Sequence, residues 1–300
     1  MLRVDKLSKN FRSFQVLKDI HINANEGQIY GLVGSNGCGK TTLLKHIIQV
    51  FRQDSGQVYF NDQVVGERSE VIKDFYYVQD DLFFPHGSTL NSLFNFEGLL
   101  YDQMSVEKFN KLTTYFKIDP NKKLANMSKG QKKQAAFVLA MSANPKVLLL
   151  DEIVDGLDAV IRRKFWNVLI KDVVGNNMTV IISSHDLKEL DNICDKVGIM
   201  HEGTIIKEEE MSSLKENLKR VQFAVAEDFE GISGDEFQIV KRIQVGKVYF
   251  MTLRGNVEAF RKALEERYQV LIFDELAVNL EEIFIAELGG AGYGTEELDA

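Results

Sequence analysis

The sequence predicts an α/β fold built on a mostly parallel sheet, and two segments carry this prediction. Gln28–Val33 has the apolar character of a β-strand, and a glycine-rich loop at residues 34–41 connects it to a helical pattern. Farther along, Val147–Leu150 is an apolar run of strand length that ends in two carboxylates, Asp151 and Glu152. Short apolar runs of this kind are typical of parallel strands that are buried on both faces.

The other elements of the N-terminal part follow in chain order. We expect strands within Val4–Val33, a helix at Thr41–Val50 and a strand at Gly56–Phe60. Thr89–Phe116 is mainly helical, because its apolar residues recur at helical spacing. These residues are Leu90, Leu93, Phe94, Leu112, Tyr115 and Phe116. The pattern predicts a helical subdomain at about residues 86–145, inserted into the sheet domain.

A further helix and a further strand are expected before the C-terminal part. The helix runs from about Lys129 to Met141, with Ser128 near its N-cap, since serine is a preferred N-cap residue. The strand is Met178–Ile182.

Beyond about Ser212 the pattern changes to that of a small α+β domain. It alternates strand-like segments with a helix capped by Asn256 and ends in a helix at Asn279–Ile285. The strand-like segments are Arg220–Ala226, Phe237–Val245, Lys247–Leu253 and Tyr268–Phe273. The predicted organisation is therefore a main domain at 1–212, an accessory domain at 213–288 and a glycine-rich, acidic, flexible tail at 289–300.

Composition narrows the class of protein. The chain has 300 residues, of which 45% are hydrophobic and 27% charged, a globular profile. A net charge of −8 argues against nucleic acid as the main partner. The two cysteines, Cys38 and Cys194, give no disulfide framework and suit a reducing compartment, and Cys194 is expected in a helix. We expect no signal peptide and no membrane span.

The glycine-rich loop has the composition of a phosphate-binding loop. Gly34, Gly37 and Gly39 allow successive backbone N–H groups to turn inward around a phosphate chain, and the helix that follows adds its positive dipole end. Lys40 is placed to reach the β- and γ-phosphates, and Thr41 to bind Mg²⁺. The alternative is an ordinary glycine-rich turn before a helix. The expected nucleotide-binding residues are Gly34, Ser35, Asn36, Gly37, Cys38, Gly39, Lys40, Thr41 and Thr42.

The two carboxylates at residues 151 and 152 supply the second half of this site. They follow a buried strand, and the carboxyl ends of strands in an open α/β sheet are where ligands bind. Asp151 is expected to hold Mg²⁺, and Glu152 to accept a proton from the attacking water. The alternative is that the two carboxylates belong to an ordinary acidic connection between a strand and a loop and have no such role.

Between these halves, Met127–Gln131 reads Met-Ser-Lys-Gly-Gln, and here the chain resembles the ATP-binding cassette (ABC) ATPases. The resemblance covers about residues 1–212. It implies a phosphate-loop NTPase core of the RecA-like type with an antiparallel β subdomain and a helical subdomain. It also implies that Ser128, Lys129, Gly130 and Gln131 bind the nucleotide of an opposing subunit.

The resemblance assigns four further residues. Phe11 corresponds to the aromatic residue that stacks on adenine, and Asp158 to the aspartate of a Gly-Leu-Asp loop. His185 corresponds to the histidine that senses the γ-phosphate, and Gln79 to a glutamine that contacts Mg²⁺ or the lytic water. Each has a simpler interpretation: core packing for Phe11, a helix cap for His185, a solvated loop amide for Gln79.

The family resemblance also implies partners and a location. ATP and Mg²⁺ are the expected cofactors, and a homodimer or a pair of cassettes is the expected assembly. A separate integral membrane permease would place the chain at the cytoplasmic face of the membrane. Phe83 and Phe84 either belong to the permease-docking groove or are buried in the helical subdomain.

Three classes of function remain open on the sequence alone. The first is the ATPase of a bacterial exporter of the drug and peptide-antibiotic group, favoured by the single cassette and by the final helix. The second is a soluble mechanoenzyme, for which paired cassettes, a coiled-coil insertion or basic arms are missing. The third is a weakly hydrolysing regulatory subunit.

Three departures from the family pattern bear on hydrolysis. Lys129 stands where glycine is commonest, and Ile153 replaces a proline after Glu152. Because proline restricts φ, we expect a looser connection there and slower or less tightly coupled hydrolysis. Cys38 lies beside Lys40 at a helix N-terminus, which predicts increased thiolate character and alkylation that blocks nucleotide binding.

Overall fold

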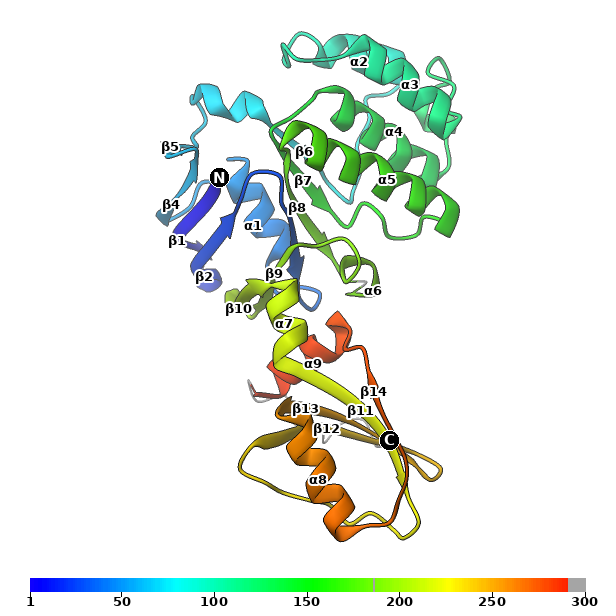
Figure 1. Cartoon of the computed structure of the whole chain (residues 1–300). Coiled ribbons are helices and arrows are strands. Elements are labelled where there is room, and N and C mark those ends of the chain that lie inside the picture. The colour runs from blue at the N-terminus through cyan, green and yellow to red at the C-terminus, as the bar shows by residue number, and fades with distance from the viewer. Residues whose placement is uncertain (186, 291–300) are drawn as a thin grey trace. The chain divides into compact units, whose positions relative to one another are not determined.

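The computed structural model describes residues 1–185 and 187–290, with side chains to residue 286, so Asp186 and residues 291–300 of the expected tail lie outside the described residues. The first two residues of that tail, 289 and 290, were expected to be flexible, but they continue the last helix, which ends at Gly290. The chain divides into two compact units (Figure 1). The first comprises Met1–Asp186 and Ile193–Glu208, and the second comprises Leu187–Asn192 and Glu209–Ala300. The division therefore falls a few residues before the predicted boundary at residue 212.

A six-stranded sheet forms the centre of the first unit, in the order β10-β9-β3-β8-β7-β6. Pairing is parallel from β9 through β3, β8 and β7 to β6. The strands are β3 (Ile29–Val33), β6 (Phe75–Val78), β7 (Val147–Asp151), β8 (Thr179–Ser184), β9 (Lys196–His201) and β10 (Thr204–Glu210). Every residue of β3, β7 and β8 is buried, as expected for parallel strands covered on both faces. The carboxyl ends of these strands consequently meet at one edge.

A second, antiparallel sheet has the order β2-β1-β4-β5. Its strands are β1 (Leu2–Phe11), β2 (Phe14–Ala24), β4 (Ser55–Phe60) and β5 (Gln63–Val64). One hydrophobic core joins this sheet to the central sheet and to α1 (Lys40–Ile47), with Leu7, Leu44 and Leu149 among its fully buried members. The helix after the glycine-rich loop is therefore held between two sheets.

The predicted helical subdomain is present as an insertion between β6 and β7. Its helices are α2 (Leu90–Glu97), α3 (Val106–Phe116) and α4 (Lys129–Ser142), with a short 3₁₀ turn at Leu124–Asn126. Another 3₁₀ turn, Glu70–Asp74, precedes β6. Ser128 caps α4 as expected: its hydroxyl accepts from the N–H of Gln131, whose side chain accepts in turn from the N–H of Ser128. Phe137 of α4 stacks on Phe165 of α5 (Ala159–Asn176), with ring centroids 3.5 Å apart. This contact ties the insertion to the sheet domain.

The second unit contains a four-stranded antiparallel sheet, in the order β12-β13-β11-β14, with α8 packed on one face. Its strands are β11 (Leu218–Val225), β12 (Phe237–Val245), β13 (Val248–Gly255) and β14 (Val270–Leu276). Its helices are α6 (Leu187–Leu190), α7 (Met211–Asn217), α8 (Val257–Arg267) and α9 (Leu280–Gly290). Asn256 caps α8, as its sequence position predicts. The core is aromatic and includes Phe223, Tyr249 and Phe260.

Another expectation about local structure is wrong, and one strand is not predicted. Cys194 was expected in a helix, but it is a buried residue of the loop before β9, with its Sγ atom 2.8 Å from where a Cβ atom of Gly31 would lie. No element is predicted from the sequence for Phe75–Val78, which forms the edge strand β6. Its pairing with β7 stabilises this short segment as a strand, and such a partner is not visible in the local sequence. Among the described residues, no helix combines the length and apolarity required to cross a bilayer.

Candidate functional site

The glycine-rich loop wraps around the amino end of α1. Gly39 has φ of 114°, and a Cβ atom on Gly34 would lie 2.4 Å from the carbonyl oxygen of Met200, so both positions require glycine. The Lys40 side chain is only 5% exposed, and its Nζ donates to the carbonyl oxygens of Gly34 (2.8 Å) and Ser35 (3.2 Å). A buried ammonium group at a helix N-terminus that faces a glycine loop suits the phosphate chain of a nucleotide.

The expectation of a reactive Cys38 is wrong. The side chain is 6% exposed, and burial raises the pKa of its thiol, an effect that outweighs the neighbouring charge of Lys40. Its Sγ atom lies 2.6 Å from where a Cβ of Gly34 would be, so the thiol packs inside the loop. Burial of the thiolate costs more free energy than the Lys40 charge and the backbone hydrogen bonds return.

We therefore expect slow alkylation of Cys38 in the folded protein. At pH 7.5, an iodoacetamide probe should label it at least about tenfold more slowly than a free thiol, because both the thiolate fraction and access are reduced. Peptide mass spectrometry over time measures the rate, with the same chain unfolded in urea as the control. Labelling at the rate of the unfolded chain would contradict the buried geometry.

The two carboxylates after β7 have different environments. Asp151 is 1% exposed, and its oxygens accept hydrogen bonds from the hydroxyls of Ser183 (2.5 Å) and Tyr77 (3.1 Å). Glu152 is partly exposed, with Oε1 3.9 Å from Lys40 Nζ. Burial and the adjacent Asp151 raise the pKa of Tyr77, so its hydroxyl stays a donor. The Asp151 carboxylate is thus held in place by hydrogen bonds, whereas the Glu152 carboxylate is accessible to a substrate.

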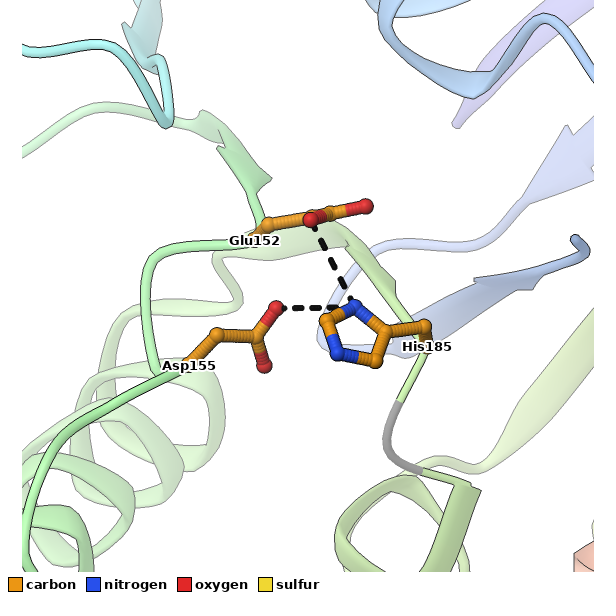
Figure 2. Close-up of side chains that lie close together, drawn as sticks. All are labelled: Glu152, Asp155 and His185. Carbon is orange, nitrogen blue, oxygen red and sulfur yellow. Dashed lines mark ion pairs between the residues drawn. The ribbon is translucent and has the colours of Figure 1, made fainter. Parts of the chain in front are cut away.

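His185 follows β8 and faces Glu152 across the sheet edge, together with Asp155 (Figure 2). Its Nδ1 lies 3.2 Å from Asp155 Oδ2 and 3.5 Å from Glu152 Oε2. Burial is the main cause that raises the pKa of Asp155, while the nearby His185 opposes it. Asp155 directly precedes Gly156, and no role is predicted for it from the sequence. The sequence does place a third carboxylate in the same short loop as residues 151 and 152, and this could have indicated a role for Asp155.

Gln79 and Phe11 lie at two separate borders of this site. Gln79 directly follows β6, whose Val78 pairs with Leu150, so it lies at the same sheet edge as the carboxylates. Phe11 lies at the tip of the β1–β2 hairpin, 42% exposed, with its ring edge-on to Phe51 at 5.6 Å. Part of the Phe11 ring is therefore open for stacking, and it is not a core residue.

Residues of the segment Met127–Gln131, which we call the signature residues, border a different hollow of about 500 Å³. Its lining includes Ser128, Gly130 and Gln131 from the start of α4 and Asp158 from the start of α5. Asp158 caps α5 by accepting from the N–H groups of residues 160 and 161. Lys129 is exposed at the same helix start.

The predicted site residues thus form two groups within the first unit. Lys40, Glu152 and His185 lie together at the carboxyl edge of the central sheet, as the ion-pair distances show. Ser128, Gly130, Gln131 and Asp158 line the second hollow, and none of the residues that line it comes from the glycine-rich loop.

Comparison with known proteins agrees with this geometry. Residues 17–155 match the family model described as ABC transporter. The chain is 31% identical over 290 residues to the ABC transporter ATP-binding protein YtrB of Bacillus subtilis, covering 97% of this chain and 99% of YtrB. It is 28% identical over 305 residues to the bacitracin transport ATP-binding protein BcrA of Enterococcus faecalis, covering 97% of each.

Two further similarities extend the comparison. The chain is 30% identical over 213 residues to the spermidine/putrescine import ATP-binding protein PotA of Fusobacterium nucleatum, covering 69% of this chain and 56% of PotA. Among solved structures, a dimeric post-hydrolysis state of the ATP-binding cassette MJ0796 bound to ADP and Pi has a TM-score of 0.62 at 21% identity. It covers 70% of this chain and 99% of that one. The chain belongs to the ABC transporter ATP-binding proteins, and it is an ATPase with the α/β fold of these cassettes.

Proposed function

We propose that this chain hydrolyses MgATP to power export through a separate membrane permease, and that it works as a head-to-tail pair of cassettes. The observation that carries the proposal is the separation of the two residue groups. Lys40 and Glu152 lie at one site, whereas Ser128 borders another hollow. A second cassette facing the first would bring its Ser128 to the nucleotide and complete the site.

The residues at the sheet edge suit a magnesium-bound nucleotide. Thr41 offers an exposed hydroxyl beside Lys40, and Asp151 offers a carboxylate whose other contacts are hydroxyl donors. Oxygen donors of this kind are the ligands that Mg²⁺ prefers. The ion would supply positive charge to the β- and γ-phosphates. Glu152 would accept the proton of the attacking water, and His185 would contact the γ-phosphate.

We assign this activity to residues 1–212 and an accessory role to residues 213–288. The division into compact units near Glu208 supports that boundary. Similarity to YtrB and to the bacitracin transport protein BcrA along 97% of this chain includes the accessory part and supports a transporter subunit that comprises both parts. PotA, named as an import protein, matches only 69% of the chain. Peripheral location at the cytoplasmic face follows from docking to a permease.

A groove of about 500 Å³ next to Gln79 supports the docking role. Phe83 is 80% exposed on its rim, and Phe96 is 59% exposed beside it, so these aromatic side chains are not buried in the helical subdomain. Exposed aromatic residues around a concave apolar surface are typical of a protein interface. We propose that the groove receives a cytoplasmic segment of the permease.

Replacement of Phe83 and Phe84 with Ala together should abolish co-purification with the membrane subunit while ATP binding is kept. Loss of two interface aromatics costs roughly 2–4 kcal/mol, which weakens binding at least about 30-fold. The measurement is affinity purification from detergent-solubilised membranes with mass spectrometry. Val174→Ala, an exposed apolar position on α5, is the control and should co-purify normally. Retained association of the double variant would refute the docking assignment.

A further inference from the structure

Lys133 is a buried lysine to which the proposed function assigns no role. It lies on α4, five residues after Ser128, and is 1% exposed. Its Nζ donates to the carbonyl oxygens of Glu152 (2.8 Å) and Asp155 (3.0 Å), and it lies 3.2 Å from Asp80 Oδ1. A buried ammonium group is stable only when its three donors are satisfied, and here three acceptors from two other segments satisfy them.

The carbonyl that Lys133 holds belongs to a residue in an unusual backbone conformation. Glu152 has φ of 48°, in the left-handed region that residues with a side chain rarely adopt. Such a conformation costs on the order of 1–3 kcal/mol and persists only where the surroundings impose it. The N–H of Glu152 donates to Ser183 of β8 (3.1 Å), and its carbonyl accepts from Lys133. Both backbone polar groups of Glu152 are therefore anchored.

This anchoring changes the expected effect of Ile153. The absence of proline at this position predicted a loose connection, yet Ile153 and Val154 are 0% and 1% exposed. Lys133 bonds to the carbonyls on both sides of this pair. The connection is thus fixed by burial and by a lysine from another helix.

We propose that Lys133 is a positioning residue for hydrolysis, which holds the Glu152 carboxylate toward the nucleotide by fixing its left-handed backbone. The proposal rests on the proposed role of Glu152 as general base. The third partner of Lys133, Asp80, also relates this lysine to the docking groove. Asp80 directly follows Gln79 of the docking groove, and Ala136 and Leu139 of α4 also line that groove. Lys133 therefore connects the groove to the catalytic loop.

The test is Lys133→Met, which keeps much of the side-chain volume and removes all three donors. We expect turnover at saturating ATP to fall at least about tenfold, while the KM for ATP and the affinity for a fluorescent ADP analogue stay within about twofold. This split is expected because the contacts of Lys40 are untouched. Lys133→Gln keeps an amide donor and should lose less turnover. If the Met variant does not fold, the same measurements on the Gln variant test the proposal.

Two controls separate the outcomes. Met141→Ala removes a fully buried side chain from the same helix without touching the loop, so it should lower the melting temperature and leave turnover within about twofold. Full turnover in Lys133→Met, or a raised KM with unchanged turnover, would overturn the positioning role. Glu152→Gln, assayed in parallel, tests the general base itself. If it turned over normally, the proposed function would fail independently of Lys133.

Discussion

Glu152→Gln is expected to lower steady-state ATP turnover by at least about 100-fold, the size of effect that a general base contributes. The amide keeps the shape of the side chain but cannot accept the proton of the attacking water. ATP binding should survive, because Lys40 keeps its contacts with the loop carbonyls of Gly34 and Ser35. Phosphate release measures turnover, and sedimentation velocity with MgATP measures the pairing of cassettes. The pairs should persist at least as long as those of the unmodified chain, because the nucleotide is not hydrolysed.

The matched control is Glu107→Gln, which removes the same charge from an exposed position on α3 that pairs with Lys111. It should turn over like the unmodified chain, since exposed pairs of this kind contribute little. Equal turnover in the Glu152 variant would count against the general base and in favour of a weakly hydrolysing regulatory subunit.

Lys40→Ala is expected to abolish measurable nucleotide binding and, with it, ATP-dependent pairing. Charge-assisted hydrogen bonds to phosphate are worth about 1.5–3 kcal/mol each, so losing two weakens binding by at least about 100-fold. A fluorescent ATP analogue measures affinity, and sedimentation velocity measures pairing. Nucleotide binding and pairing should fail together, because in the proposed mechanism the nucleotide joins the two cassettes.

Lys45→Ala is the control for this variant. It lies on the same helix, with its Nζ 5.8 Å from the centre of the Phe51 ring. It should bind nucleotide and pair normally. A Lys40→Ala protein that holds MgATP and pairs as tightly as the unmodified chain would remove the basis of the proposed mechanism.

Local features of the fold were predictable because their causes lie within a few residues. Ser128 caps α4 through Gln131 three residues later, and Asn256 caps α8 by accepting from the N–H groups of Glu258 and Ala259. The glycine-rich loop is similar: its turn depends on glycines within six residues and on the strand and helix that flank it. The edge strand β6 escaped prediction because pairing with β7 stabilises it.

The sequence by itself determined the loop, the carboxylates after β7 and the capped signature helix, because backbone conformation and capping act over short distances along the chain. Only the tertiary structure decided that Cys38 is buried with a raised thiol pKa, that Asp155 faces His185, and that Lys133 holds the Glu152 backbone. These depend on desolvation and on contacts between residues 19 to 30 positions apart, which no local pattern specifies.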